Sequence, residues 1–131
     1  MDDSIFSKIV KNKIHSYKVY ENKSFLAFLD AYPLTLGHVL VIPKKQDDYL
    51  FDLDEVEYLE LWSFAKKVAK AMDKVIICER IGVSVIGLEV PHVHIHLVPI
   101  NDILDLDFSN RREFTKKEMI DIASKISDAI I

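Results

Sequence analysis

Residues 91–99 read Pro91-His92-Val93-His94-Ile95-His96-Leu97-Val98-Pro99, so three of the five histidines in the chain stand at two-residue spacing between two prolines. Side chains of a β-strand alternate between its two faces, so this pattern predicts a strand with the three histidines on one face. The aliphatic residues between them then form the opposite face and pack on a core. At a rise of about 3.3 Å per residue, neighbouring imidazoles would lie roughly 6.6 Å apart, which suits a groove for a chain of phosphates.

The size and composition of the chain predict one globular domain that spans residues 1–131. Half of its 131 residues are hydrophobic, which is enough for a core without disulfides or a structural metal. Cys78 is the single cysteine, which excludes a disulfide within the chain and fits a reducing compartment. The acidic start of the chain does not resemble a signal peptide, and no apolar run approaches the ~20 residues of a membrane span. We therefore expect a cytoplasmic protein with no membrane contact.

The formal net charge of −4 restricts the classes of ligand. A protein that holds long nucleic acid neutralises many phosphates with basic residues, so we expect no such partner. A small anionic ligand remains compatible with this charge, because a local site need not follow the global balance.

The rest of the pattern predicts an α+β fold. The expected elements are a short helix over 4–11, strands over 17–20, 25–29 and 38–42, a long helix that opens at 52–55, a strand over 81–90 broken at Gly87, the histidine strand, and a C-terminal helix behind the capping box of Thr115 and Glu118. These elements give an antiparallel five-stranded sheet with a long inserted helix. The chain has only three glycines and no Gly-rich loop between a strand and a helix, which disfavours a parallel nucleotide-binding fold.

The three histidines allow three interpretations. They could be surface or interface residues of a half-buried strand. They could bind a metal, because His-x-His on a strand offers two imidazoles to zinc and His38 could supply a third. They could also serve in nucleophilic catalysis, because a neutral imidazole attacks phosphorus at neutral pH and the resulting phosphoramidate is cleaved by water. We favour the third interpretation, with the middle histidine flanked by groups that bind phosphate oxygens.

The chain resembles the histidine triad (HIT) family of nucleotide hydrolases and transferases, in particular its Hint-like branch. Five ordered motifs between residues 4 and about 100 carry the resemblance: Ile5-Phe6-Ser7-Lys8-Ile9, Val19-Tyr20-Glu21, Leu26-Ala27-Phe28-Leu29-Asp30, Gly37-His38-Val39-Leu40-Val41-Ile42-Pro43-Lys44, and His92-x-His94-x-His96. Residues 101–131 form a C-terminal extension beyond the firm resemblance.

The resemblance implies a separate catalytic role for each of four histidines. His94 is expected to be the nucleophile that attacks the α-phosphorus and becomes nucleotidylated. His92 and His38 are expected to orient the triad through hydrogen bonds, which fixes the free ring nitrogen of His94. His96 is expected to contact the phosphate and the leaving group. This chemistry requires no cofactor.

The resemblance also implies a nucleotide-binding pocket. Asp30 corresponds to a carboxylate that accepts hydrogen bonds from the ribose hydroxyls, although a turn residue is the alternative interpretation. Four apolar residues correspond to the pocket for the base, with ordinary core packing as their alternative role: Ile5, Phe6, Ile9 and Phe28.

The chain departs from the family pattern at two places. Many relatives bind a structural zinc through a Cys-x-x-Cys and a later histidine, whereas this chain has Ser4, Ser7 and Gln46 there, so we predict no metal. Leu88 stands where the family usually has a glutamine that contacts the phosphate region, and a leucine cannot donate that hydrogen bond. Glu89 stands at the position of a serine that assists the leaving group in Hint-type relatives.

These features together predict a hydrolase or nucleotidyl transferase of the phosphoramidase type. Its ligand would be a purine nucleotide or a nucleotide conjugate, attacked at the α-phosphate through a covalent nucleotidyl-histidine intermediate. The alternative is a nucleotide-binding HIT protein with weak or no catalysis, which the leucine at position 88 favours. Family members usually dimerise through the long helix and an adjoining strand, so we also predict a homodimer.

Overall fold

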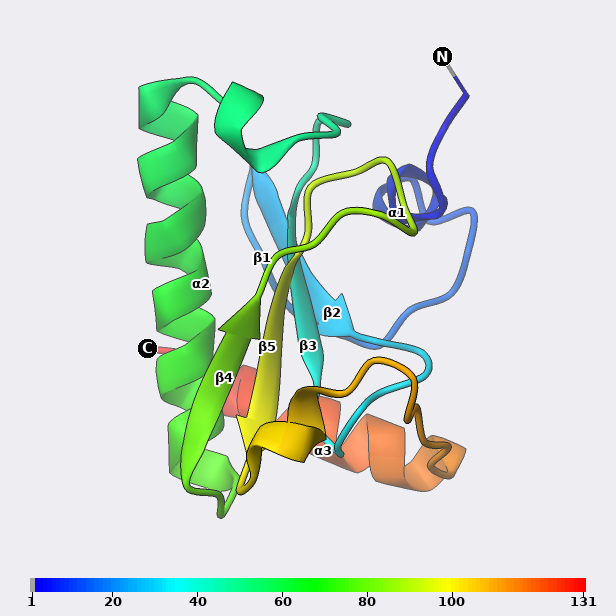
Figure 1. Ribbon diagram of the computed structural model, residues 1–131, viewed down its shortest axis with the longest axis vertical. Helices are drawn as coiled ribbons and strands as arrows, with labels where there is room; N and C mark the ends of the chain where they lie inside the picture. Colours follow the sequence, from blue (N-terminus) through cyan, green and yellow to red (C-terminus); the bar gives the residue numbers. More distant parts are fainter. Residues whose placement is uncertain (1) are drawn as a thin grey trace.

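The computed structural model describes residues 2–131, which form an α+β fold around one five-stranded sheet (Figure 1). Its elements in chain order are α1 (Ile5–Val10), β1 (Lys18–Glu21), β2 (Phe25–Leu29), β3 (Val39–Pro43), the 3₁₀ helix η1 (Leu50–Asp52), α2 (Glu55–Val75), β4 (Arg80–Ser84), β5 (Ile95–Ile100), the 3₁₀ helix η2 (Ile103–Leu106) and α3 (Lys116–Asp128). The strand order is β1-β2-β3-β5-β4, and all four pairings are antiparallel. The predicted fold class is therefore confirmed.

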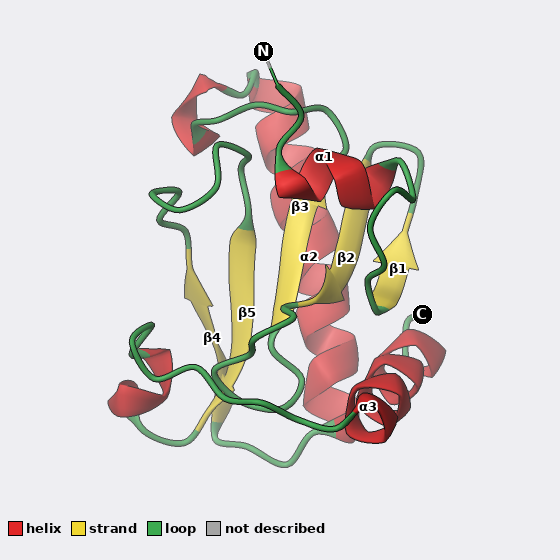
Figure 2. Ribbon diagram, turned by 90° about the vertical axis from the view of Figure 1, so that its right-hand side faces the viewer, coloured by secondary structure: helices red, strands yellow, loops and turns green. Residues whose placement is uncertain are grey.

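The sheet is covered on both faces, and the strand sequences show this directly. In β2, Phe25, Ala27 and Leu29 pack in one hydrophobic core with α2 and α3, while Leu26 and Phe28 pack in a second core with α1. Figure 2 shows α1 on one side of the sheet and α2 on the other. Because both faces of β2 and β3 are buried, these strands consist of apolar residues throughout.

Side-chain caps fix the starts of the three α-helices. The side chains of Ser4, Asp54 and Thr115 each accept a hydrogen bond from the backbone N–H of the third residue that follows. Thr115 and Glu118 form the predicted capping box. No helix within residues 2–131 is long and apolar enough to cross a membrane, and the cytoplasmic location stays a prediction.

Two strand predictions were wrong in extent. The strand predicted over 81–90 ends at Ser84, and Gly87 in the following loop has a φ of +80°. The histidine strand begins only at Ile95, so His92 and His94 precede it. The reason is that this stretch leaves the sheet: the N–H of His92 bonds the carbonyl of Val90, and the N–H of Val93 bonds the carbonyl of Asp47.

The C-terminal segment, residues 107–115, runs from η2 to α3 without regular secondary structure. The backbone N–H of Arg112 donates to the carbonyl of Pro33 at 2.8 Å, which holds this segment against the loop between β2 and β3. The segment therefore passes the end of the sheet where β2 stops and β3 starts.

Candidate active site

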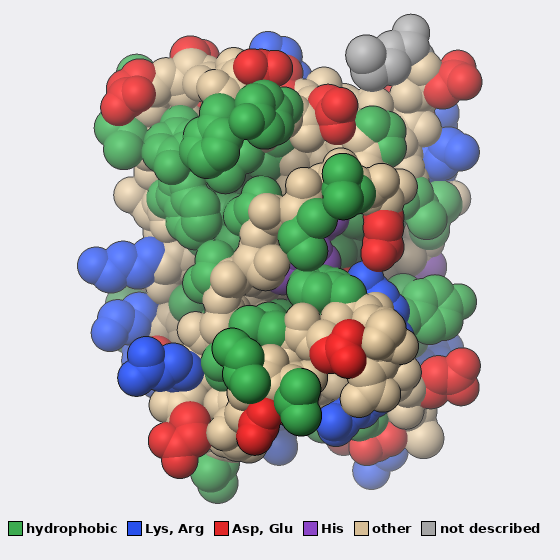
Figure 3. Space-filling view, viewed as in Figure 1, with side chains coloured by type: hydrophobic (Ala, Val, Ile, Leu, Met, Phe, Trp, Pro, Cys, Tyr) green, Lys and Arg blue, Asp and Glu red, His purple; other side chains and the backbone are tan. Residues whose placement is uncertain are grey.

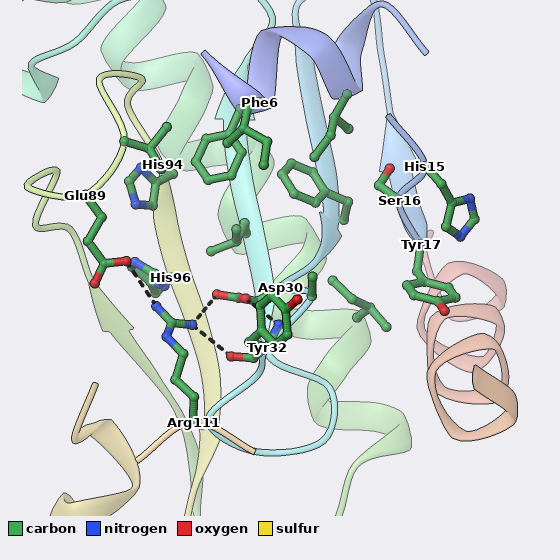
Figure 4. Close-up of a pocket in the computed structure, with 17 residues that line it drawn as sticks. Phe6, His15, Ser16, Tyr17, Asp30, Tyr32, Glu89, His94, His96 and Arg111 are labelled. Carbon is green, nitrogen blue, oxygen red and sulfur yellow. Dashed lines mark hydrogen bonds and ion pairs between the residues drawn. The ribbon is translucent and has the colours of Figure 1, made fainter. Parts of the chain in front are cut away.

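A cavity of about 400 Å³ lies between α1, the sheet, the loop after β4 and the C-terminal segment. Figure 3 shows histidine side chains inside a hollow near the middle of the molecule. Figure 4 shows His94, His96, Asp30, Glu89 and Arg111 at one end of the cavity. The volume is within the range of small-molecule binding sites.

The tautomer of His94 follows from its contact with the backbone. Its Nδ1 lies 2.7 Å from the carbonyl oxygen of His92. A carbonyl only accepts hydrogen bonds, so Nδ1 carries the proton and Nε2 of the neutral ring has a free electron pair. Burial lowers the pKa of His94 below its ordinary value of 6.5, against the opposing effect of that carbonyl. At neutral pH the ring is therefore an uncharged potential nucleophile.

His38 and His96 form a relay that fixes the tautomer of His96. The backbone N–H of Leu34 donates to Nδ1 of His38 at 3.0 Å, so the His38 proton is on Nε2. That Nε2–H donates to Nδ1 of His96 at 2.9 Å, which leaves the His96 proton on its own Nε2. Burial lowers the pKa of His38 to about 4 and that of His96 to about 3, so both rings are neutral at pH 7. His96 thus offers an N–H donor.

His92 does not share the row of imidazoles that the sequence predicts. Its Nε2–H donates to the carbonyl of Pro43 at 2.7 Å, and its Nδ1 accepts from the hydroxyl of Ser4 at the same distance. The ring is fully buried and does not line the cavity. The rings of His94 and His96 are 4.9 Å apart, closer than the predicted spacing, because the chain leaves the regular strand before Ile95.

The residues at the positions where many relatives bind zinc form hydrogen bonds with one another and with His92. The hydroxyl of Ser7 and the backbone N–H of Ser4 both donate to Oε1 of Gln46 at 2.8 Å. The hydroxyl of Ser4 reaches His92, as described above. Hydroxyl and amide oxygens are not the thiolate and imidazole ligands of structural zinc, so this donor set does not fit that metal.

A second group of potential metal ligands lies beside the cavity. Within residues 2–131, Asp30, His38 and His96 have potential ligand atoms within 4.8 Å of one another. The two imidazoles already share a hydrogen bond, in which Nε2 of His38 carries the proton. A protonated nitrogen cannot bind a metal, so the relay fits this geometry and a metal does not.

Arg111 and Phe108 are site residues that the sequence interpretation missed. Nη1 of Arg111 donates to Oδ2 of Asp30 and to the carbonyl of Tyr32, both at 2.8 Å. The ring of Phe108 lies edge-on to His96, with 4.7 Å between centroids, and the guanidinium lies over the same ring at 5.6 Å. The segment that carries both residues has no periodicity, and the pair of arginines at 111 and 112 after an acidic stretch was its one signal.

The structure brings most of the predicted site residues to this cavity. Its wall contains His94 and His96 together with all five predicted nucleotide contacts: Asp30, Phe28, Ile5, Phe6 and Ile9. His38 and His92 lie behind it. Leu88 points into solvent and is 90% exposed, whereas Glu89 and Val90 line the cavity. The assigned roles of these residues stay predictions.

Comparison with known proteins agrees with this geometry. A model of the HIT domain matches residues 11–103. An uncharacterized HIT-like protein of Borreliella burgdorferi is 38% identical over 106 residues, which cover 76% of each chain. Adenosine 5′-monophosphoramidase HNT1 of Saccharomyces cerevisiae is 40% identical over 75% of this chain and 63% of its own length. The crystal structure of a Hit-like protein involved in cell-cycle regulation from Bartonella henselae superposes with a TM-score of 0.86 at 30% identity, over 98% of this chain and 97% of that one.

Proposed function

The chain belongs to the histidine triad (HIT) family, and from this premise we propose that it is a nucleotide hydrolase or nucleotidyl transferase acting at the α-phosphate of a purine nucleoside phosphoramidate or a related nucleotide conjugate. The observation that carries the proposal is the hydrogen bond from Nδ1 of His94 to the carbonyl of His92. This bond leaves Nε2 of His94 as an unprotonated nitrogen in a ring that lines the cavity.

In the first step, Nε2 of His94 attacks the α-phosphorus. A bond forms between this nitrogen and phosphorus, while the bond to the leaving amine breaks and the amine departs with its electron pair and takes up a proton from water. The substituted imidazole becomes cationic, and the carbonyl of His92 stabilises that charge through the Nδ1–H bond. The Nε2–H of His96 stabilises the developing charge on a phosphoryl oxygen.

In the second step, water or another acceptor attacks the same phosphorus and loses a proton to solvent. The bond to His94 breaks, its electron pair returns to Nε2, and the nucleotide is released. Water as the acceptor gives hydrolysis, and a different acceptor gives transfer. The low pKa of His96 keeps its ring neutral and so prevents a second charge beside the His94 cation, while the hydrogen bond from His38 keeps its proton on Nε2 as a donor.

The other end of the cavity supports a nucleoside ligand. The rings of Phe6 and Phe28 meet edge to face, with centroids 5.6 Å apart, in an apolar wall suited to a flat base. Asp30 accepts from the backbone N–H of Tyr32 through Oδ1 and from Arg111 through Oδ2. Each carboxylate oxygen accepts more than one hydrogen bond, so both ribose hydroxyls can be bound there. The name of the yeast relative supports adenosine as the nucleoside.

The second candidate function is a nucleotide-binding protein with weak or no turnover. The observation in its favour is the exposed leucine at position 88, where the family usually has a glutamine that reaches the phosphates. The two functions share the ligand and differ in whether the His94 adduct forms.

The test combines turnover with trapping of the intermediate. Wild-type protein is incubated with adenosine 5′-monophosphoramidate, release of AMP is followed by chromatography, and intact mass is measured after rapid mixing. We expect turnover and an acid-labile gain of one AMP, both lost in His94→Ala while AMP binding and the circular dichroism spectrum are retained. If the wild-type protein binds AMP but forms no adduct and has no turnover, the second function is favoured. If the wild-type protein neither binds AMP nor has turnover, the nucleotide proposal is refuted.

We also propose that the protein is a homodimer, because the exposed Tyr49 and Phe51 begin a row of aromatic rings and the sheet has an unpaired edge. Consecutive ring contacts of 5.5, 6.4 and 6.4 Å connect Tyr49, Phe51, Tyr58 and Trp62 across η1 and α2. β4 is one of the two edge strands of the sheet, and β1 is the other. Exposed aromatic side chains and an unpaired edge strand are each typical of a surface that binds a partner.

A further inference from the structure

Arg111 comes to the cavity from outside the family match. The HIT domain model matches residues 11–103, and Arg111 lies in the C-terminal segment beyond them. The backbone bond from Arg112 to Pro33 and the ring of Phe108 fix this segment on either side of Arg111. The Arg111 side chain is 27% exposed, so its guanidinium is partly desolvated at the mouth of the cavity.

The charges around the cavity are unfavourable for binding an anion unless the Arg111 guanidinium contacts that anion. Arg111 is the one Lys or Arg among the described residues that line the cavity, and Asp30 and Glu89 are the carboxylates there. His94 and His96 are neutral at pH 7 because burial lowers the pKa of each. Two negative groups and one positive group leave the cavity at −1, and a nucleotide phosphate adds further negative charge.

We propose that Arg111 is the phosphate-binding cation of this site and makes it select nucleotides over the corresponding nucleosides. Its Nη1 stays bonded to Asp30, which binds the ribose, while its Nη2 donates to an oxygen of the α-phosphate on the side of His96. This inference rests on the proposed nucleotide function and assigns the group that recognises the charge of its substrate.

The geometry holds the guanidinium in a position suited to this role. Nη1 is fixed by two acceptors at 2.8 Å, Oδ2 of Asp30 and the carbonyl of Tyr32. Nη2 forms an ion pair with Oε2 of Glu89 at 3.7 Å, which is beyond hydrogen-bond distance. Figure 4 shows this second nitrogen directed toward the Glu89 carboxylate, in the part of the cavity that also contains His96. An arginine held in this way loses little further freedom when it binds a phosphate oxygen.

The experiment compares binding of AMP and adenosine, which differ by the phosphate alone. Dissociation constants are measured by titration calorimetry at low salt for wild type, Arg111→Ala, Arg111→Lys and Arg112→Ala. Arg112→Ala is the matched control, because this substitution removes the same charge one residue away and the Arg112 side chain does not line the cavity. We expect Arg111→Ala to weaken AMP binding about 10- to 100-fold and to change adenosine binding less than about threefold. Arg111→Lys should be intermediate, and Arg112→Ala should bind both ligands as wild type does.

The possible outcomes separate this inference from the function on which it rests. Equal weakening of AMP and adenosine by Arg111→Ala would overturn it, because Arg111 would then act only by positioning Asp30. Unchanged AMP binding in Arg111→Ala would also overturn it, with the nucleotide function intact. A wild-type protein that binds neither ligand would instead refute the proposed nucleotide site itself.

Discussion

The hydroxyl of Ser4 lies 2.7 Å from Nδ1 of His92, a residue 88 positions further along the chain. The same hydroxyl accepts from the backbone N–H of Ser7 and so caps α1. His92 in turn provides the carbonyl that orients His94. One side chain thus connects the start of the N-terminal helix to the segment that holds the candidate nucleophile.

Replacement of Ser4 by alanine should destabilise the protein by more than the loss of a helix cap. The change removes a cap, worth about 1 kcal/mol, and removes the close donor to Nδ1 of the buried His92, worth about a further 1–3 kcal/mol, because the Ser7 hydroxyl lies 3.4 Å from that nitrogen and donates to Gln46. Urea denaturation of Ser4→Ala and of Thr115→Ala measures the difference, because Thr115 caps α3 and contacts no histidine. Equal losses of unfolding free energy in the two variants would contradict a structural role for the Ser4–His92 bond.

The sequence predicts the fold well where its signals are local. The apolar run of Phe25–Leu29 and the capping box of Thr115 depend on neighbouring residues only, and the structure confirms them. The spacing of the histidines placed His94 and His96 correctly in one site but predicted the wrong path for the chain at His92. That path is set by hydrogen bonds to residues about 45–90 positions away, which no local pattern contains.

The missed part of the site depends entirely on tertiary structure. Arg111 reaches Asp30 across 81 residues of sequence, because the C-terminal segment folds back over the loop at Pro33. The tautomers of His38 and His96 likewise depend on a backbone N–H at Leu34 and on the contact between the two rings. The spacing of the motifs identifies these histidines, but it does not determine which ring nitrogen of each carries the proton.

The stability of the protein should decrease as the pH falls below about 6.5. Burial lowers the pKa of His38 to about 4 and that of His96 to about 3, and it also lowers the pKa values of His92 and His94. Between these folded values and 6.5 the unfolded chain binds more protons than the folded one, so unfolding becomes easier. Each such histidine contributes up to about 1.4 kcal/mol per pH unit. Urea denaturation at pH 7.5, 6.0 and 5.0 measures this, and a constant unfolding free energy would contradict it.

Loss of the relay between His38 and His96 should reduce turnover more than nucleotide binding. In His38→Phe the ring is retained in shape, but the donor to Nδ1 of His96 is absent, so His96 no longer keeps its proton exclusively on Nε2. We expect kcat to fall about tenfold or more, with a smaller change in the dissociation constant of AMP. Nitrogen-15 NMR of His96 gives an independent readout, because the two tautomers have different shifts. If His38→Phe had a reduced kcat but the same nitrogen-15 shifts of His96 as the wild type, the proposed relay would be refuted.

A charge in the exposed aromatic row should dissociate the proposed dimer. Phe51 is 67% exposed, so Phe51→Glu costs little in the monomer fold but buries a carboxylate in an interface formed by this row. Sedimentation velocity at micromolar concentration should give a dimer for wild type and a monomer for Phe51→Glu. Ile77→Glu is the control, because Ile77 is fully exposed at the other end of α2. A monomeric wild type would contradict the dimer.

Leu88 and Glu89 should differ sharply in their effect on the site, although they are adjacent. Leu88 points into solvent, so Leu88→Gln should change kcat/KM less than about threefold. Glu89 lines the cavity, and Glu89→Gln raises the charge there from −1 to 0, so AMP should bind several-fold more tightly. Calorimetry and turnover assays of both variants measure these effects. A tenfold gain in turnover for Leu88→Gln would contradict this prediction, because it would show that residue 88 reaches the phosphate when substrate is bound.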